Sequence, residues 1–235
     1  GDNVYFAVDG LLHNAPLEAL SDSAGRLACE KYHLYRLSST RELCKTNKRK
    51  IKNAVLYGGL MYGDKKSEED NVTRSGWDYL PSTKIEVEEV ASQMNVLGFS
   101  VDKKEGYEGT EKSLKSMSGG NTSILHVATH GFYFSEKDAA RTDYYNEQQH
   151  ISSMKRSGLM MSGGQAAWLG NKEFEMEDDG VLLADEISHM DLKQTDLVVL
   201  SACQTALGDI DNSAEGVFGI QRAFKLAGVN SLLLT

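Results

Sequence analysis

The sequence is poor in cysteine and proline and contains no long apolar run. Its three cysteines form no CxxC pair, and their odd number fits a reducing compartment better than a disulfide framework. No apolar run approaches the roughly 18 residues needed to span a bilayer, and no signal peptide is recognisable. Phosphate-binding glycine patterns are missing too, because Gly58-Gly59 lacks both the GxGxxG spacing and a Lys-Ser/Thr ending. We therefore expect a cytoplasmic protein with no membrane segment.

The charge balance argues against a nucleic-acid partner. Asp and Glu number 34 against 25 Lys and Arg, which gives a formal net charge of −9. Such a chain presents an acidic, solvated exterior rather than a phosphate-binding surface. The one basic run, residues 45–52, is interpreted as a solvated turn rather than a phosphate groove. No cofactor is expected.

Length and composition allow one sizeable domain over residues 1–235. A chain of 235 residues with 40% hydrophobic and 25% charged residues can bury a substantial core. Both ends look cut, because Gly1 is not an initiator methionine and residues 231–235 resemble a buried strand with no following element to cover it. We therefore expect part of a longer polypeptide.

Strand and helix patterns alternate, which predicts an α/β fold with a mostly parallel sheet covered by helices on both faces. The expected strands are residues 4–8, 32–37, 54–61, 99–103, 123–129, 197–201 and 231–234. Thr83 and Glu86 predict a capping box for a helix that stops at Gly98. Two more helices are expected to begin at Thr110 and Ser213, and the last should end at Gly228.

Residues 135–179 break this alternation with a long stretch rich in Gly, Ser, Met, Gln and charge. A loop of such length in a compact domain is usually functional or disordered. It leaves one predicted strand and returns before the next, which fits a lid or a substrate-binding loop. A mobile surface insertion is an equal alternative.

Two predicted strands end in residues that can do chemistry. The segment 124–129 leads to His130, and the segment 197–201 leads to Cys203. Both read as fully buried parallel strands, and open α/β sheets place their chemistry outside the carboxyl ends of the strands. The two residues are too far apart for a local metal motif but suit a pair that the fold brings together. His130 could then activate the Cys203 thiol to attack a carbonyl carbon, the alternative being an inert core cysteine.

Neighbouring residues have weaker assignments. The backbone N–H groups of Gly131 and Cys203 could form an oxyanion hole for acyl transfer, although Gly131 could also be an ordinary glycine at a strand exit. His126 lies four positions before His130. On a strand these positions do not converge, so a structural role is favoured over a metal site. Cys29 and Cys44 are interpreted as packing residues.

Several short motifs follow one another along the chain. They are Asp9-Gly10-Leu11-Leu12-His13, Pro16-Leu17-Glu18-Ala19-Leu20, Leu80-Pro81 with Glu86 and Glu89, His126-Val127-Ala128-Thr129-His130-Gly131, Ser157-Gly158-Leu159, Asp179-Gly180-Val181-Leu182 through Glu186-Ile187, Leu200-Ser201-Ala202-Cys203-Gln204-Thr205, and Arg222-Ala223-Phe224 with Ala227-Gly228-Val229. In this order they resemble the caspase-like CHAT domain family, relatives of separase, caspases and gingipains.

The resemblance implies a caspase-like three-layer α/β/α sandwich, a Cys203/His130 dyad, an oxyanion hole from Gly131 and Cys203, and cleavage of a protein or peptide substrate. It also implies regulation by an attached helical-repeat sensor such as a tetratricopeptide array. The leading interpretation is a cysteine endopeptidase. One alternative is a non-cleaving scaffold that binds a partner in a signalling complex. Another, a nucleotide-binding domain, lacks its phosphate loop.

The residue two positions before the nucleophile bears on specificity. Caspase-like enzymes that cut after basic residues often carry an aspartate there, whereas this chain has Ser201. Ser201 is therefore expected to line a neutral substrate pocket, because a buried Lys or Arg without a counter-charge is costly. Basic specificity would need an acid from elsewhere, and the candidates are Asp178, Asp179, Asp185, Glu186 or a segment after Thr235.

Overall fold

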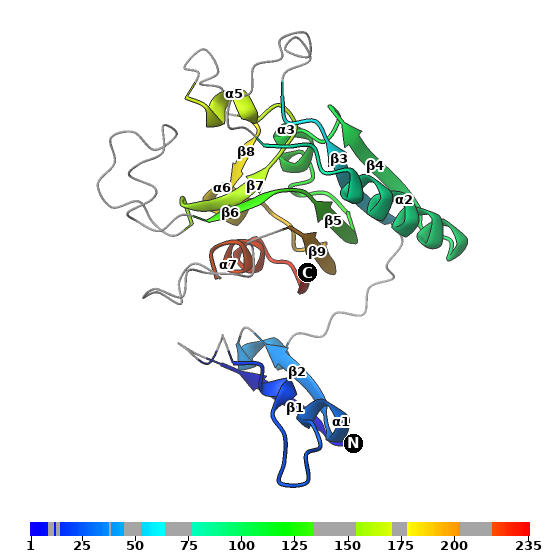
Figure 1. Cartoon of the computed structure of the whole chain (residues 1–235), viewed down its shortest axis with the longest axis vertical. Helices are drawn as coiled ribbons and strands as arrows, with labels where there is room; N and C mark the ends of the chain where they lie inside the picture. Colours follow the sequence, from blue (N-terminus) through cyan, green and yellow to red (C-terminus); the bar gives the residue numbers. More distant parts are fainter. Residues whose placement is uncertain are drawn as a thin grey trace. The chain divides into compact units, whose positions relative to one another are not determined.

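The computed structural model describes residues 1–8, 12, 15–37, 39–44, 53–63, 77–133, 154–170, 178–202 and 218–235. These residues form two compact units, Gly1–Arg49 and Lys50–Thr235 (Figure 1). The predicted basic turn at 45–52, the helix start at Ser213 and the cysteine at position 203 lie outside the described residues. No helix within these ranges is both long enough and apolar enough to cross a bilayer.

The first unit is built on two parallel strands, β1 (Asn3–Ala7) and β2 (His33–Leu37). Their ring pair Tyr5 and Tyr35 stacks with centroids 4.7 Å apart. Three short helices belong to the same unit: η2 (Leu17–Ala19), α1 (Ala28–Lys31) and η3 (Thr40–Cys44). Both of its cysteines, Cys29 and Cys44, are exposed, so the prediction that they are packing residues is wrong.

The second unit is organised around a five-stranded, all-parallel sheet with the order β10-β9-β5-β3-β4. The strands are β3 (Asn53–Leu60), β4 (Ser100–Gly106), β5 (Ile124–Ala128), β9 (Leu197–Ser201) and β10 (Ser231–Leu234). Each coincides with a predicted strand, although the boundaries shift by up to three residues. The predicted strands at 4–8 and 32–37 do not join this sheet in the described structure but pair with each other.

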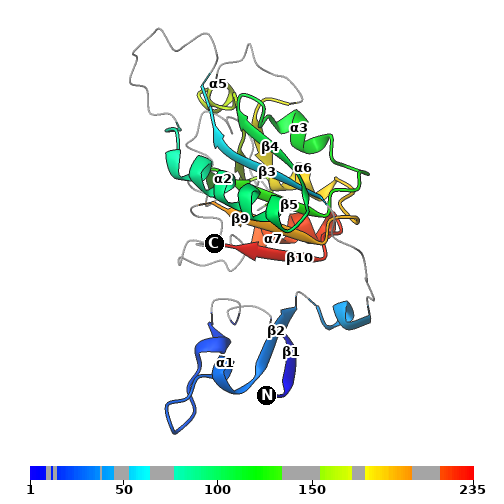
Figure 2. The same cartoon turned by 90° about the vertical axis from the view of Figure 1, so that its right-hand side faces the viewer.

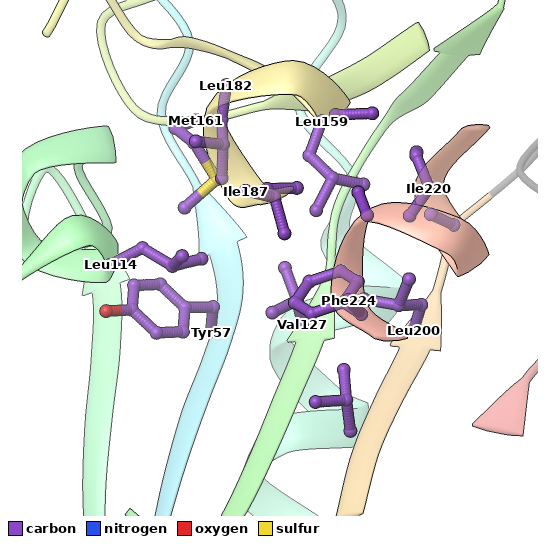
Figure 3. Close-up of a cluster of buried hydrophobic side chains, with 14 of the residues drawn as sticks. Tyr57, Leu114, Val127, Leu159, Met161, Leu182, Ile187, Leu200, Ile220 and Phe224 are labelled. Atoms are coloured by element: carbon purple, nitrogen blue, oxygen red, sulfur yellow. The ribbon is translucent and has the colours of Figure 1, made fainter. Parts of the chain in front are cut away.

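Helices cover both faces of the sheet, as the alternation of buried side chains requires. One face is covered by α2 (Pro81–Val96) (Figure 2). Its Val87 and Ala91 belong to a buried cluster with Leu56 and Ile124 of the sheet. On the other face, Val127 and Leu200 belong to a buried cluster that includes Phe224 of α7 (Phe218–Leu226), Ile187 of α6 (Ala184–Ser188) and, beside Tyr57, Leu114 of α3 (Glu111–Lys115) (Figure 3). The predicted three-layer α/β/α arrangement with a parallel sheet is confirmed.

The start of α2 differs from the prediction. Pro81 is the first helical residue and Leu80 the N-cap, so Thr83 stands inside the first turn instead of at the cap. Proline suits this position because its fixed φ is helical and the N–H group that it lacks would be unpaired there. The Thr83 hydroxyl donates to the Leu80 carbonyl at 2.7 Å and accepts from Gly59 N at 2.9 Å. Glu86 is therefore not part of a capping box, and its side chain is free for another role.

Three other helix boundaries follow the sequence. Thr110 caps α3, with its hydroxyl accepting from Ser113 N at 3.1 Å. Gly98 ends α2 with φ +82°, and Gly228 follows α7 with φ +101°. Both angles lie in the left-handed region that glycine adopts without strain, which explains why the helices stop there.

A small antiparallel sheet lies next to the parallel one and is not anticipated by the sequence patterns. Its strands are β6 (Gly131–Tyr133), β7 (Ser157–Met160) and β8 (Val181–Leu183), in the order β6-β7-β8. The middle strand β7 and the helix α5 (Gln165–Trp168) fall within the segment 135–179 that reads as a loop. Residues 134–153 and 171–177 of the chain lie outside the described structure.

Candidate active site

The carboxyl ends of β5 and β9 lie side by side. The two strands are parallel neighbours, with Ala128 opposite Ser201, and Thr129 N donates to the Ser201 carbonyl at 3.1 Å. His130 follows directly from β5, and the predicted nucleophile stands two residues beyond Ser201 in the sequence. The strand pairing thus brings together in space the two segments that carry the predicted dyad, although they are far apart in the sequence. The position of Cys203 itself is outside the described residues.

The His130 imidazole is held by a backbone carbonyl. Its Nε2 atom lies 2.7 Å from the Asp78 carbonyl oxygen, in the segment that precedes α2. A carbonyl oxygen can only accept, so Nε2 carries the proton and, in the neutral ring, Nδ1 keeps the lone pair. The Tyr62 and Trp77 rings flank the imidazole, with centroids 5.0 and 4.9 Å from its own. This arrangement leaves Nδ1 as the nitrogen that can accept a proton.

The residue before His130 is fixed by a buried hydroxyl chain. Thr129 Oγ1 donates to the Met160 carbonyl at 2.6 Å and lies 2.9 Å from the Tyr62 hydroxyl. Because the single threonine proton is used on the carbonyl, the Tyr62 hydroxyl must donate to Thr129. Burial raises the pKa of Tyr62, and the bond to Thr129 opposes this only in part, so the phenol keeps its proton. The chain ties β5 to β7 just before the histidine.

Gly131, the second predicted oxyanion donor, begins β6 and pairs with Leu159 of β7. The Met160 N–H donates to the His130 carbonyl at 2.9 Å. His130 and Met160 are therefore a hydrogen-bonded pair of the antiparallel ladder. Hydrogen-bonded and non-hydrogen-bonded pairs alternate, so the next pair, Gly131 and Leu159, is not hydrogen-bonded. The pairing with β7 therefore does not consume the Gly131 N–H group.

Aromatic rings form one side of the His130 environment. Trp77 contacts the imidazole and also Trp168 of α5, with ring centroids 5.1 Å apart. Phe132 of β6 packs against Trp168 at 4.9 Å. The segment 157–170, which sequence patterns assign to a loop, thus supplies part of the support for the predicted catalytic histidine.

Ser201 contacts a carboxylate that the sequence patterns did not place there. Its hydroxyl donates to Glu86 Oε2 at 3.0 Å, and the other carboxylate oxygen lies 2.9 Å from His126 Nε2, which donates. Burial lowers the pKa of His126, and the Glu86 carboxylate opposes this only partly. His126, for which the sequence favours a structural role, thus links β5 to α2. The spacing of Thr83 and Glu86 predicts a capping box, and this prediction is wrong because the Glu86 carboxylate accepts from Ser201 and His126 instead.

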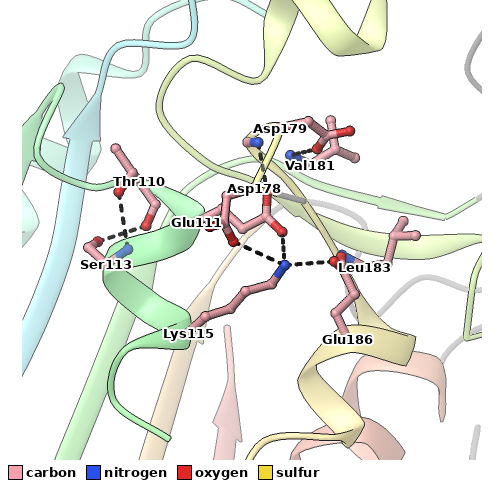
Figure 4. Close-up of polar contacts among 10 residues, drawn as sticks. Thr110, Glu111, Ser113, Lys115, Asp178, Asp179, Val181, Leu183 and Glu186 are labelled. Atoms are coloured by element: carbon pink, nitrogen blue, oxygen red, sulfur yellow. Dashed lines mark hydrogen bonds and ion pairs between the residues drawn. The ribbon is translucent and has the colours of Figure 1, made fainter. Parts of the chain in front are cut away.

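Three of the four acids proposed as alternative pocket residues are occupied elsewhere. Lys115 Nζ lies 3.3 Å from Asp178 Oδ1 and 2.8 Å from Glu186 Oε1, and it also pairs with Glu111 (Figure 4). Asp179 Oδ1 accepts from Val181 N at 2.8 Å. These contacts join α3 to β8 and α6, so three of the four candidates serve local structure.

The buried member of this cluster is Glu111, whose side chain is 1% exposed. Burial raises its pKa to about 7, the Glu186 charge acts in the same direction, and bonds from Lys115 and Gly180 N oppose the shift. Burial by itself would lower the pKa of Lys115, but the bonds to Glu111 and Glu186 outweigh it and raise the pKa. The ammonium therefore stays charged and Glu111 is the group that titrates near neutrality.

Comparison with known families adds one finding to this geometry. Residues 1–235, the whole chain, match the CHAT domain. No curated protein matches the chain. The five-stranded parallel sheet packed against helices agrees with a caspase-like fold. The chain belongs to the CHAT domain family, a family of caspase-like peptidases.

Proposed function

We propose that this chain is a cysteine endopeptidase in which Cys203 is the nucleophile and His130 the general base and acid. The observation that carries the proposal is the pairing of β5 with β9, because it brings the ends of both predicted catalytic segments together. The Asp78 carbonyl supports it further, since it accepts from Nε2 and so leaves the lone pair of the neutral ring on Nδ1. Membership of a caspase-like peptidase family favours the same chemistry.

In this reaction the Cys203 thiol gives its proton to His130 Nδ1, and the thiolate sulfur attacks the carbonyl carbon of the scissile peptide. The carbonyl π electrons move to oxygen, and the oxyanion accepts hydrogen bonds from the N–H groups of Gly131 and Cys203. The intermediate collapses with rupture of the C–N bond, and the imidazolium returns its proton to the leaving amine. Water, deprotonated by His130, then hydrolyses the thioester and restores the thiol.

A second candidate is a non-cleaving module that binds a partner through the same strand ends. The observation in its favour is that Ser201, two residues before the predicted nucleophile, donates a hydrogen bond to Glu86. This bond joins β9 to α2, so it can serve the fold and not a reaction. We favour the peptidase because the sequence has both the histidine and the cysteine of the dyad and because β7 does not use the Gly131 N–H group for strand pairing. Regulation by an attached helical-repeat sensor belongs to the same proposal.

The test is to incubate the purified protein with a peptide library and to identify cleaved bonds by mass spectrometry. We expect cleavage by the native chain and its loss in both Cys203→Ala and His130→Ala, with the double variant no worse than either, because the two residues act as a unit. Cys44→Ala and His33→Ala remove the same residue types from exposed positions in the first unit and serve as matched controls. Turnover near that of the native protein in either dyad variant would contradict the assignment.

A further inference from the structure

The carboxylate of Glu86 is shared between two strands at the edge of the sheet where the proposed reaction takes place. It receives one hydrogen bond from Ser201 at the end of β9 and one from His126 in β5. The Glu86 side chain is 34% exposed, whereas that of His126 is 7% exposed. Each carboxylate oxygen thus accepts one hydrogen bond from the protein, and the partly exposed carboxylate has lone pairs left for a further donor.

The charge of this carboxylate is not balanced by its protein partners. Burial lowers the pKa of His126, which favours the neutral form of the imidazole. The Ser201 hydroxyl is neutral as well. Within the described ranges Glu86 makes no ion pair with a lysine or arginine. A carboxylate held among neutral donors is only partly compensated for its lost hydration, so an additional cation would bind favourably.

The position of the carboxylate relates it to the substrate. Ser201 precedes the predicted nucleophile by two residues, and two residues of chain span at most about 7 Å. Glu86 contacts Ser201 directly, and Ser201 also binds the backbone that leads to His130. A long side chain projecting from the residue before the scissile bond can reach across this distance.

We propose that Glu86 is a specificity-determining residue and that its carboxylate binds a lysine or arginine side chain at the substrate residue before the scissile bond. The inference rests on the proposed peptidase function. It replaces the neutral pocket expected from Ser201 by itself, because the missing acid comes from α2 and not from position 201. Ser201 and His126 orient the carboxylate from the protein side, and the substrate cation occupies the exposed side.

The experiment compares peptides that differ only in the residue before the scissile bond, which is Arg, Lys, Gln or Met. The native protein, Glu86→Gln and the control Glu89→Gln are measured with each peptide. Glu89 is exposed on the same helix, so its substitution removes the same charge away from Ser201. Gln at position 86 can still accept from one partner and donate to the other, and unfolding midpoints confirm that the variants are folded.

We expect the native protein to prefer Arg and Lys, and Glu86→Gln to reduce kcat/KM for these two peptides on the order of 10- to 100-fold, as for a lost hydrogen bond to a charged group. The Gln and Met peptides should be cleaved at nearly unchanged rates, and Glu89→Gln should behave as the native protein does. An equal loss for all four peptides would mean that Glu86 is only structural. A basic preference that survives in Glu86→Gln, or a native preference for Gln or Met, would also overturn the inference.

A binding measurement separates this inference from the proposed function. In the Cys203→Ala background, uncleaved Arg and Gln peptides are titrated with and without Glu86→Gln. Tighter binding of the Arg peptide that depends on Glu86 supports the specificity role even if the native protein cleaves nothing. Absence of that difference contradicts it whether or not cleavage occurs. Failure of cleavage by itself would count against the peptidase proposal only.

Discussion

The Nε2 atom of His130 and the backbone carbonyl of Asp78 are 2.7 Å apart, although they belong to segments on opposite sides of α2 and β4 in the sequence. The contact determines which imidazole nitrogen holds the proton, because a carbonyl oxygen cannot donate. A side-chain carboxylate would also orient the ring but would add a negative charge. A carbonyl orients it without changing the net charge of the site, and no substitution of the Asp78 side chain removes it.

Trp77→Ala is expected to impair the proposed reaction without unfolding the protein. The indole packs on both His130 and Trp168, so its loss should loosen the segment whose carbonyl holds the imidazole. Because orientation of the base matters in the chemical step, kcat should fall at least about tenfold while KM changes less. Steady-state kinetics on one cleaved peptide measures this. Tyr79→Ala, at a side chain that is 43% exposed in the same segment, should have little effect, and a matching loss there would refute the explanation.

Cys203 is expected to react with iodoacetamide much faster than Cys29 and Cys44 at about pH 6, where an ordinary exposed thiol is almost entirely protonated. The two comparison cysteines are exposed, so any difference would reflect thiolate content instead of access. Mass spectrometry of the native protein after short labelling times gives the three rates. His130→Ala should remove the advantage of Cys203. Equal rates for all three cysteines in the native protein would favour the scaffold alternative.

Glu111 is expected to make the stability of the fold depend on pH near neutrality. Its pKa rises from 4.5 to about 7 on burial, so the folded state binds the proton more tightly than the unfolded chain. The free energy of unfolding should therefore fall as the pH rises through this window, by on the order of 1–3 kcal/mol. Urea titrations at about pH 5 and about pH 8 measure the difference.

Two variants separate this group from the rest of the protein. Glu111→Gln cannot titrate and should flatten the dependence, while Glu108→Gln changes an exposed carboxyl close by and should keep it. A slope that persists unchanged in Glu111→Gln would assign it to another group.

Phe224→Ala is expected to be among the most destabilising single substitutions in the second unit. The ring is fully buried between α7 and the sheet strands that carry Val127 and Leu200 (Figure 3). Truncation leaves a cavity and should lower the free energy of unfolding by about 3–5 kcal/mol. Leu226→Ala, on the same helix with 58% exposure, should cost less than about 1 kcal/mol. Urea unfolding monitored by circular dichroism checks both, and similar losses would contradict the packing of α7.

Local patterns in the sequence predicted the elements whose causes are local. β9 and β10 coincide with the predicted strands, because each is an apolar run bounded by polar residues. Thr110 was identified as a cap because capping needs only the residues of one turn. The strands β6, β7 and β8 are three or four residues long, which is too short for a recognisable alternation, and their pairing depends on contacts far apart in the chain.

The sequence by itself determined which residue types end or follow the two predicted strands, namely His130, Gly131, Ser201 and Cys203, and it was sufficient to indicate the family. Only the tertiary structure decided that β5 and β9 are neighbours, that the Asp78 carbonyl holds the histidine, and that Glu86 bonds to Ser201. The order of strands in a sheet and the direction in which a helix side chain points depend on packing between segments that are distant in the sequence. Propensity and spacing act over a few residues, so they do not carry that information.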